Sequence, residues 1–275
     1  MLKLAVIGAQ SLLGRELVNA LEAREASVVP LSTGPLTVEE EIGDLVVFAP
    51  TPLLLEGLDA VILADTPDPA LLADFPGRIL DLRSEPEAKT DPMPLAGAWP
   101  KDARALRSRP ALEQVLALLP SLLEGLGDVG GTHLRSVAWM GDQGLDGLVE
   151  QTLAVLNGED PDLAKLGYRQ AFEVVPVTPP AGKGRLMEVR VPSFHGDLLI
   201  LQIRAAEGKS LVKKEAPAGV KWVDAAPSSR DVAVSADLLA HMDLAGDNKA
   251  AMLTLGFDPV LWGVLRPTLR VLGLM

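Results

Sequence analysis

A strand, a glycine turn and a helix follow one another at the start of this chain, and their order constrains the fold. The apolar run Leu2–Ile7 ends at Gly8, and Leu12–Arg24 carries apolar residues at helical spacing. Four more apolar runs alternate with helix-sized pieces and with Gly-, Pro- and acid-rich segments; they are Ser27–Leu31, Leu45–Ala49, Ala60–Ala64 and Arg78–Leu82. This alternation is typical of a parallel sheet with helices against it. The sequence therefore predicts an α/β fold that begins with a Rossmann-type domain.

The second half of the chain has a different pattern. Strand-like runs follow one another with few helices between them, at Leu134–Met140, Gln170–Pro176, Leu186–Phe194 and Leu198–Ala205. We expect a mostly antiparallel α+β domain, with helices over Ala111–Leu126, Leu145–Leu156 and Pro259–Leu272. Because the composition changes between Glu85 and Pro110, the predicted dinucleotide-binding domain covers residues 1–110 and is completed by a C-terminal helix over 258–275. The α+β domain covers residues 111–257.

The glycine turn is the candidate cofactor site. In dinucleotide-binding turns the glycines allow a tight bend, close approach of a pyrophosphate and close packing of helix on strand. Here the second glycine position is Ser11, whose Cβ narrows the approach, so NAD or NADP binding is possible but weakened. The alternative is that the glycines serve only the bend. The expected contacts are Gly8, Gln10, Ser11, Leu12 and Gly14, with hydroxyls from Ser32 and Thr33 after the second strand.

Charge and composition exclude several function classes. The net charge is −12 and the pI is near 4.7, which argues against a nucleic-acid surface. No apolar stretch is long enough to span a bilayer, and the N-terminus does not resemble a leader, so we expect a cytoplasmic protein. There is no cysteine, hence no disulfide and no thiolate. His133 and His241 stand apart from acidic clusters, so no metal site is predicted.

Six motifs in the same order resemble the aspartate-semialdehyde dehydrogenase family. They are Val6-Ile7-Gly8-Ala9 with Gly14, Leu55-Glu56-Gly57-Leu58-Asp59-Ala60, Ile79-Leu80-Asp81, Gln170-Ala171-Phe172-Glu173-Val174-Val175-Pro176, Val189-Arg190-Val191-Pro192-Ser193-Phe194-His195-Gly196, and Ser229-Arg230-Asp231. The chain is most similar to the cysteine-less Usg-like paralogues. The resemblance implies a Rossmann-type NAD(P)-binding domain joined to an α+β dimerisation domain of the semialdehyde dehydrogenase type.

Departures from this family fall on its chemistry. Its cysteine nucleophile opens a helix, and the matching position here is Leu112. Its general base is a histidine, and that position is Asp197. His195 lies two residues earlier, and strand alternation would place it on the same face as Asp197, as a substitute base or as an ordinary surface residue.

The substrate and cofactor contacts implied by the resemblance are only partly kept. Arg190 matches the arginine that binds the substrate carboxylate, although it could equally pair with Glu188. The family's helical insertion between two strands is reduced to Val177–Arg185. Asp65 would place an anion beside the cofactor phosphates; Arg83 either compensates for it or is an exposed surface arginine.

Two functions remain open. The first is a non-catalytic homodimeric homologue with a structural, regulatory or partner-binding role, in which no catalytic residue remains. The second is an NAD(P)-dependent oxidoreductase that acts on a small carboxylate-bearing aldehyde or carbonyl without a cysteine, with His195 or Lys183 as proton donor. A cofactor-binding sensor without turnover is a weaker third hypothesis. Arg190 and His195 are the expected substrate contacts in either case, and the apolar strands Val189–Phe194 and Leu198–Ile203 are candidates for the dimer contact.

Overall fold

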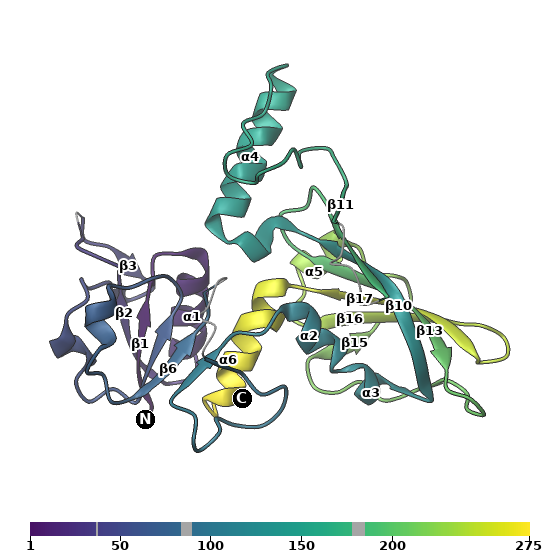
Figure 1. Cartoon of the computed structure of the whole chain (residues 1–275), viewed down its shortest axis with the longest axis horizontal. Coiled ribbons are helices and arrows are strands. Elements are labelled where there is room, and N and C mark those ends of the chain that lie inside the picture. Colours follow the sequence, from purple (N-terminus) through teal and green to yellow (C-terminus); the bar gives the residue numbers. More distant parts are fainter. Residues whose placement is uncertain (37, 84–89, 178–184) are drawn as a thin grey trace. The chain divides into compact units, whose positions relative to one another are not determined.

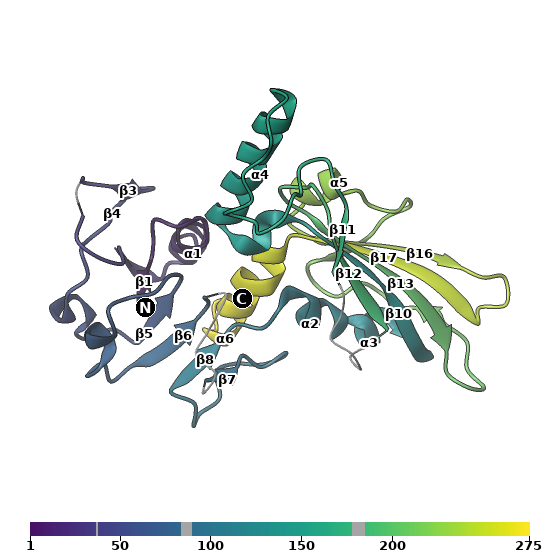
Figure 2. The same cartoon turned by 45° about the horizontal axis from the view of Figure 1, so that its top comes forward.

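The computed structural model describes residues 1–36, 38–83, 90–177 and 185–275. The chain forms two compact units, one made of Met1–Pro110 with Gly263–Met275 and the other of Ala111–Trp262. Figures 1 and 2 show a sheet in each. The described part of the chain contains no helix with the length and apolar character that crossing a membrane requires.

The first unit is built on a parallel sheet in the order β2-β1-β5-β6-β8-β7. Its strands are β1 (Lys3–Ile7), β2 (Ser27–Leu31), β5 (Ala60–Leu63), β6 (Arg78–Asp81), β7 (Asp91–Pro92) and β8 (Ala105–Arg107). Its helices are α1 (Leu12–Glu22), α6 (Arg266–Val271) and the short 3₁₀ helices η1 (Pro52–Leu55) and η2 (Pro69–Leu72). The chain runs from β1 to β2 on one side and later to β5 on the other, so the topological switch point lies between β1 and β5.

The second unit contains a seven-stranded sheet in the order β11-β12-β10-β13-β17-β16-β15, in which most neighbours are antiparallel. These strands are β10 (Leu126–Arg135), β11 (Val175–Val177), β12 (Leu186–Arg190), β13 (Asp197–Ala205), β15 (Val220–Trp222), β16 (Leu238–Leu244) and β17 (Ala250–Phe257). One face carries the main core, with Leu199, Leu201, Leu253 and Leu255 fully buried. Helices α2 (Ala111–Leu116) and α3 (Leu119–Leu122) pack against that core, and α5 (Ser229–Ala233) contacts β13 and β17.

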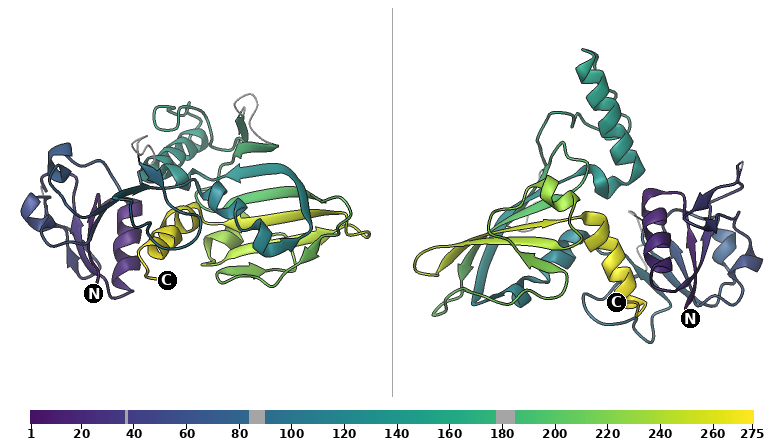
Figure 3. Two further views of the ribbon diagram at one scale, coloured as in Figure 1. Left: turned by 60° about the horizontal axis from the view of Figure 1, so that its bottom comes forward. Right: turned by 180° about the vertical axis from the view of Figure 1, so that it is seen from behind.

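Helix α4 (Asp142–Leu156) extends away from this sheet, and Figures 1 and 3 show it with only its returning chain beside it. The short helix η3 (Val137–Met140) connects it to β10. A small separate hydrophobic cluster of Val137, Leu148, Leu166 and Ala171 packs α4 against η3 and against the chain that returns from α4. The remaining short strands are β9 (Leu123–Glu124), which pairs with β14 (Val212–Lys213), and the hairpin β3 (Glu41–Ile42) and β4 (Leu45–Val46).

The structure confirms the predicted fold class, but several of the strands and helices that the sequence predicted were wrong. The run Leu45–Ala49 does not form a full strand of the parallel sheet, because Gly43 (φ +61°) turns the chain into the β3–β4 hairpin; only Phe48 makes a parallel bridge to Leu31. The Leu-rich run over Ala111–Leu126 is not one helix. It is broken into α2 and α3, and Pro120 is tolerated only in the first turn of α3.

Errors in the second half have similar local causes. The strand expected over Leu134–Met140 is instead the end of β10 followed by η3, because β10 runs through the glycine-rich stretch Leu126–Arg135. A Cβ on Gly131 would lie 2.0 Å from the Ile200 carbonyl oxygen, so the close approach of β13 requires glycine there. Only Val175–Val177 of the predicted strand Gln170–Pro176 is extended.

The C-terminal helix also departs from its expected form. A π-helical segment, η4 (Leu261–Leu265), precedes α6, and Pro267 follows in the first turn of α6. Proline has no N–H to donate and its ring collides with the carbonyl four residues earlier, which favours a locally widened helix. The Val177–Arg185 connection and Lys183 fall on residues 178–184, outside the described residues.

Gly14 allows α1 to pack directly against the preceding turn. A Cβ on Gly14 would lie 2.1 Å from the Gly8 carbonyl oxygen and 2.6 Å from the Ala9 Cα. We therefore expect Gly14→Ala to destabilise the first unit by about 2 kcal/mol, because overpacking outweighs the gain in helix propensity.

Urea unfolding followed by circular dichroism measures this effect. The matched control is Gly34→Ala, since nothing lies within 4 Å of a Cβ at Gly34. Equal midpoints for the two variants would contradict the packing argument.

Candidate functional site

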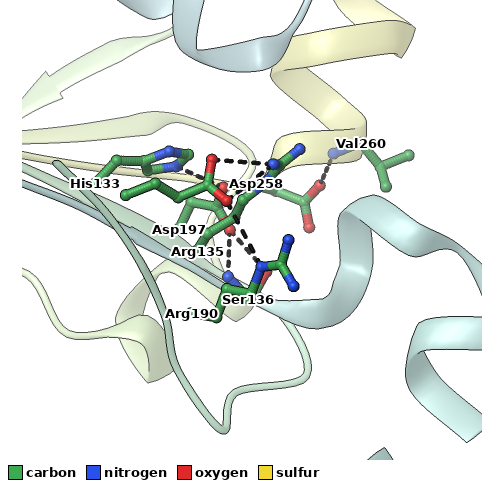
Figure 4. Close-up of polar contacts among 8 residues, drawn as sticks. His133, Arg135, Ser136, Arg190, Asp197, Asp258 and Val260 are labelled. Atoms are coloured by element: carbon green, nitrogen blue, oxygen red, sulfur yellow. Dashed lines mark hydrogen bonds and ion pairs between the residues drawn. The ribbon is translucent and has the colours of Figure 1, made fainter. Parts of the chain in front are cut away.

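Asp197, at the start of β13, is the centre of a buried polar network in the second unit. Its Oδ1 accepts hydrogen bonds from the Ser136 backbone N–H (2.9 Å) and hydroxyl (2.7 Å), and its Oδ2 lies 2.8 Å from His133 Nε2. Figure 4 shows these contacts. His133, Ser136 and Asp197 are 3%, 0% and 1% exposed. A carboxylate held by three donors and closed off from solvent is not available to take a proton from a substrate.

Leu112 is equally unsuited to catalysis. It lies in α2, partly buried, and packs against the main core of the second unit. A hydrocarbon side chain cannot form a covalent intermediate with an aldehyde. The two positions that the family resemblance assigns to nucleophile and base are thus occupied by a partly buried leucine and a buried, hydrogen-bonded carboxylate.

Arg190 belongs to an alternating stack of cations and aromatic rings on the second unit. The Arg135 guanidinium lies 3.9 Å from the Trp139 ring centre, while that of Arg190 lies 4.4 Å from the Tyr168 ring and 5.9 Å from Trp139. Glu188 contacts Arg135 through both carboxylate oxygens at 3.1 and 3.2 Å. The stack therefore holds two positive charges against one negative charge.

Part of the Arg190 guanidinium is left without a hydrogen bond. Its Nε lies 3.8 Å from Glu188 Oε1, which is too long for a hydrogen bond, and it is buried without another acceptor among the described residues. The buried Tyr168 hydroxyl likewise has no partner there. An arginine N–H without an acceptor is the kind of donor that a carboxylate can accept.

The strand alternation that was expected to place His195 on the same face as Asp197 does not apply. Gly196 has φ +85° and β13 begins only at Asp197, so strand alternation does not reach His195. The His195 side chain is 37% exposed, with Nδ1 3.8 Å from Asp258 Oδ2. Asp258 also accepts hydrogen bonds from the Val260 and Leu261 N–H groups, at the start of the C-terminal helix.

His133 and His241 each lie beside one carboxylate. His133 contacts Asp197, and His241 Nε2 lies 3.3 Å from Asp243 Oδ1. One carboxylate is not an acidic cluster, so these contacts do not contradict the expectation that both histidines stand apart from such clusters. Over residues 1–36, 38–83, 90–177 and 185–275, no group of three or more His, Asp or Glu side chains is placed to hold a metal ion.

In the first unit, the glycine turn satisfies its own hydrogen bonds. The Ser11 hydroxyl donates to the Gly8 carbonyl (2.8 Å) and accepts from the Gly14 N–H (3.1 Å), which makes Ser11 the N-cap of α1. Gly8 adopts φ +80° and donates its N–H to Leu31. Gln10 and Leu12 lie in the same turn and at the first position of α1.

Ser32 and Thr33 supply the two hydroxyls that follow β2. Ser32 is 2% exposed and donates to the carbonyls of Gly34 (2.5 Å) and Phe48 (3.3 Å), so its hydroxyl shapes the loop. Thr33 is partly buried. Glu39, Glu40 and Glu41 are exposed, as expected for a solvated run.

These residues do not fit the phosphates of a dinucleotide. Asp65 follows β5 directly beside the turn: a Cβ on Gly8 would lie 2.4 Å from Asp65 Cβ. Arg83 is not the exposed arginine expected, because it forms a two-pronged ion pair with the buried Asp81 at 2.8 and 2.6 Å. The glycine turn thus has a carboxylate beside it. The Arg83 guanidinium reaches the neighbouring Thr66 hydroxyl (3.4 Å), but its charge is already paired with Asp81.

Sequence reasoning missed His133, Ser136, Arg135, Trp139 and Tyr168. His133 and Asp197 are 64 residues apart. The available signal was the spacing of His133 and Arg135, which places both on one face if the segment is a strand.

Comparison with solved structures identifies the fold. Aspartate semialdehyde dehydrogenase II from Vibrio cholerae, in complex with ASA, superposes with a TM-score of 0.77 at 15% identity over 100% of this chain and 98% of that one. A probable aspartate-semialdehyde dehydrogenase from Pseudomonas aeruginosa gives 0.77 at 19% identity over 99% and 97%. The enzyme from Francisella tularensis gives 0.74 at 15% identity over 99% of both chains. No protein-family model matches the sequence, and no curated protein is similar to it.

We expect the hydrogen bonds of Asp197 to contribute strongly to the stability of the second unit. Asp197→Ala removes the acceptor of three buried donors, and we expect it to lower the free energy of unfolding by about 3–5 kcal/mol. Thermal or urea unfolding measures the change.

Asp243→Ala is the matched control, because it removes an Asp–His contact whose carboxylate is 76% exposed and is expected to cost less than about 1 kcal/mol. Similar losses for both variants would show that the Asp197 network is not a structural support.

Proposed function

We propose that this chain, which has the fold of the aspartate-semialdehyde dehydrogenases, is a non-catalytic homologue of those enzymes. The observation that carries the proposal is the Asp197 carboxylate, whose oxygens are occupied by Ser136 and His133 at the position of the family's base. Leu112 supports it, since a leucine that packs against the core stands where the nucleophile is expected. Loss of an activated nucleophile alone lowers the rate by about a millionfold.

Ligand binding without turnover is compatible with this role. Among the described residues, Arg190 Nε has no hydrogen-bond partner, and the stack around it carries an excess positive charge. A small carboxylate is the ligand that such a group recognises. We propose Arg190 as the main contact of this ligand, with the partly exposed His195 as a second group on the same unit. The role of the complex is then regulatory or partner-binding.

We propose further that the protein is a homodimer and that the face of the second sheet opposite its core is the contact. Cross-strand neighbours Met187, Thr132, Ile200 and Thr254 form one row on this face, and Met252 lies on the same side. Met187 and Met252 are 45% and 39% exposed. An uncharged row of methionine, isoleucine and threonine side chains along a sheet suits a self-complementary contact between two copies.

The test of the catalytic proposal is an assay of the purified chain for phosphate-dependent oxidation of aspartate semialdehyde with NADP or NAD. We expect no turnover, and none from Leu112→Cys, because the base position remains closed by His133 and Ser136. Thiol labelling of Leu112→Cys controls for access to the new side chain. Turnover by the unmodified chain would overturn the proposal. Cysteine-independent reduction of a carbonyl by NAD(P)H would support the oxidoreductase alternative instead.

The homodimer is tested by sedimentation or light scattering at micromolar concentration. We expect a dimer that Met252→Glu converts to a monomer, since a charge would be buried at the contact. Val38→Glu, on the first unit at a residue that is 67% exposed, is the control and is expected to leave the dimer intact. A monomeric parent chain would contradict the proposal.

A further inference from the structure

We infer that the first unit does not bind a dinucleotide and that Asp65 is the residue that excludes the phosphates. This goes beyond the loss of thiol chemistry, which concerns the second unit. A protein could lack the nucleophile and base and still bind cofactor. The geometry of the first unit indicates that cofactor binding has been lost as well.

The position of Asp65 follows from the sheet. Ile7 and Leu63 are register partners on the parallel strands β1 and β5, and the Ala64 N–H donates to the Ile7 carbonyl (2.9 Å). The residues that follow, Gly8 and Asp65, therefore meet at the switch point, where ligands of this sheet class bind. The Asp65 backbone N would lie 2.8 Å from a Cβ on Gly8, so its side chain begins against the turn itself.

The charge of Asp65 opposes a pyrophosphate. Its Oδ1 accepts a hydrogen bond from the Thr66 N–H (2.7 Å), which holds the carboxylate near its own backbone and thus near the turn. Asp65 is exposed, so water weakens its repulsion of a phosphate, but like charges that are only a few ångströms apart still repel each other.

The donors that would compensate are committed elsewhere. The Gly14 N–H is bonded to the Ser11 hydroxyl, and that hydroxyl donates to Gly8. The Arg83 guanidinium is paired with Asp81, and the Ser32 hydroxyl is bonded to loop carbonyls. A bound phosphate would have to break these contacts as well as approach Asp65.

Calorimetric titration of the full chain with NADP and NAD tests the inference. We expect no binding to the parent chain at millimolar cofactor. Asp65→Asn keeps an oxygen for the Thr66 N–H and removes the charge, so we expect it to bind both cofactors at least about tenfold more tightly than the parent. This gain should not be seen with Asp74→Asn, which removes an exposed charge from the same unit.

Two additional variants sharpen the result. Ser11→Gly combined with Asp65→Asn widens the turn and should bind more tightly again, because glycine at an N-cap costs only a few tenths of a kcal/mol. Asp65→Ser, whose hydroxyl can also accept from Thr66, replaces Asp65→Asn if that variant fails to fold by circular dichroism.

Micromolar binding of either cofactor by the parent chain would overturn the inference. So would an Asp65→Asn affinity no higher than that of Asp74→Asn, because Asp65 would then not be the excluding group. Binding is read here without turnover. A chain that binds NADP but does not oxidise aspartate semialdehyde would sink this inference and leave the proposed loss of catalysis intact.

Discussion

One buried carboxylate organises the polar end of the second unit. Burial of an ionised group is tolerated only where donors replace the lost water, and Asp197 obtains three from residues on or just after β10. The requirement fixes the start of β13 against the end of β10. Helix η3 begins immediately afterwards, and its first N–H is bonded to Ser193. The base of α4 and the Trp139 ring are therefore positioned by the same network.

The overall fold could be predicted because it depends on local patterns. Leu4–Ile7 are fully buried and the apolar positions of α1 repeat at helical spacing, so β1 and α1 are recognisable within the first 24 residues. Strand β10 was missed because its glycines carry no hydrophobic pattern; the need for glycine at Gly131 comes from the close approach of Ile200, which is far away in sequence. The π-helical turn before α6 also depends on how a single proline is accommodated.

The site was predictable only in part. The family resemblance located Leu112, Asp197 and Arg190, and each lies in an environment that the sequence did not reveal. Asp197 suggested a weak base, but the contact with His133 spans 64 residues and turns it into a structural group. For Arg190, the sequence left open whether it binds a ligand or pairs with Glu188. The aromatic partners Tyr168 and Trp139 come from the chain on either side of α4, and no local pattern connects them with β12.

Ser11 has a consequence for the evolution of the first unit. In a turn that relies on bound phosphate, the helix donors are satisfied only in the complex, so folding and ligand concentration are thermodynamically linked. The Ser11 hydroxyl satisfies the Gly14 donor from within the chain. The Gly14 donor therefore needs no bound phosphate to be satisfied, and this hydrogen bond is present at any ligand concentration. A turn capped from within the chain keeps its shape whether or not a ligand is bound, so its fold and its binding properties can change separately.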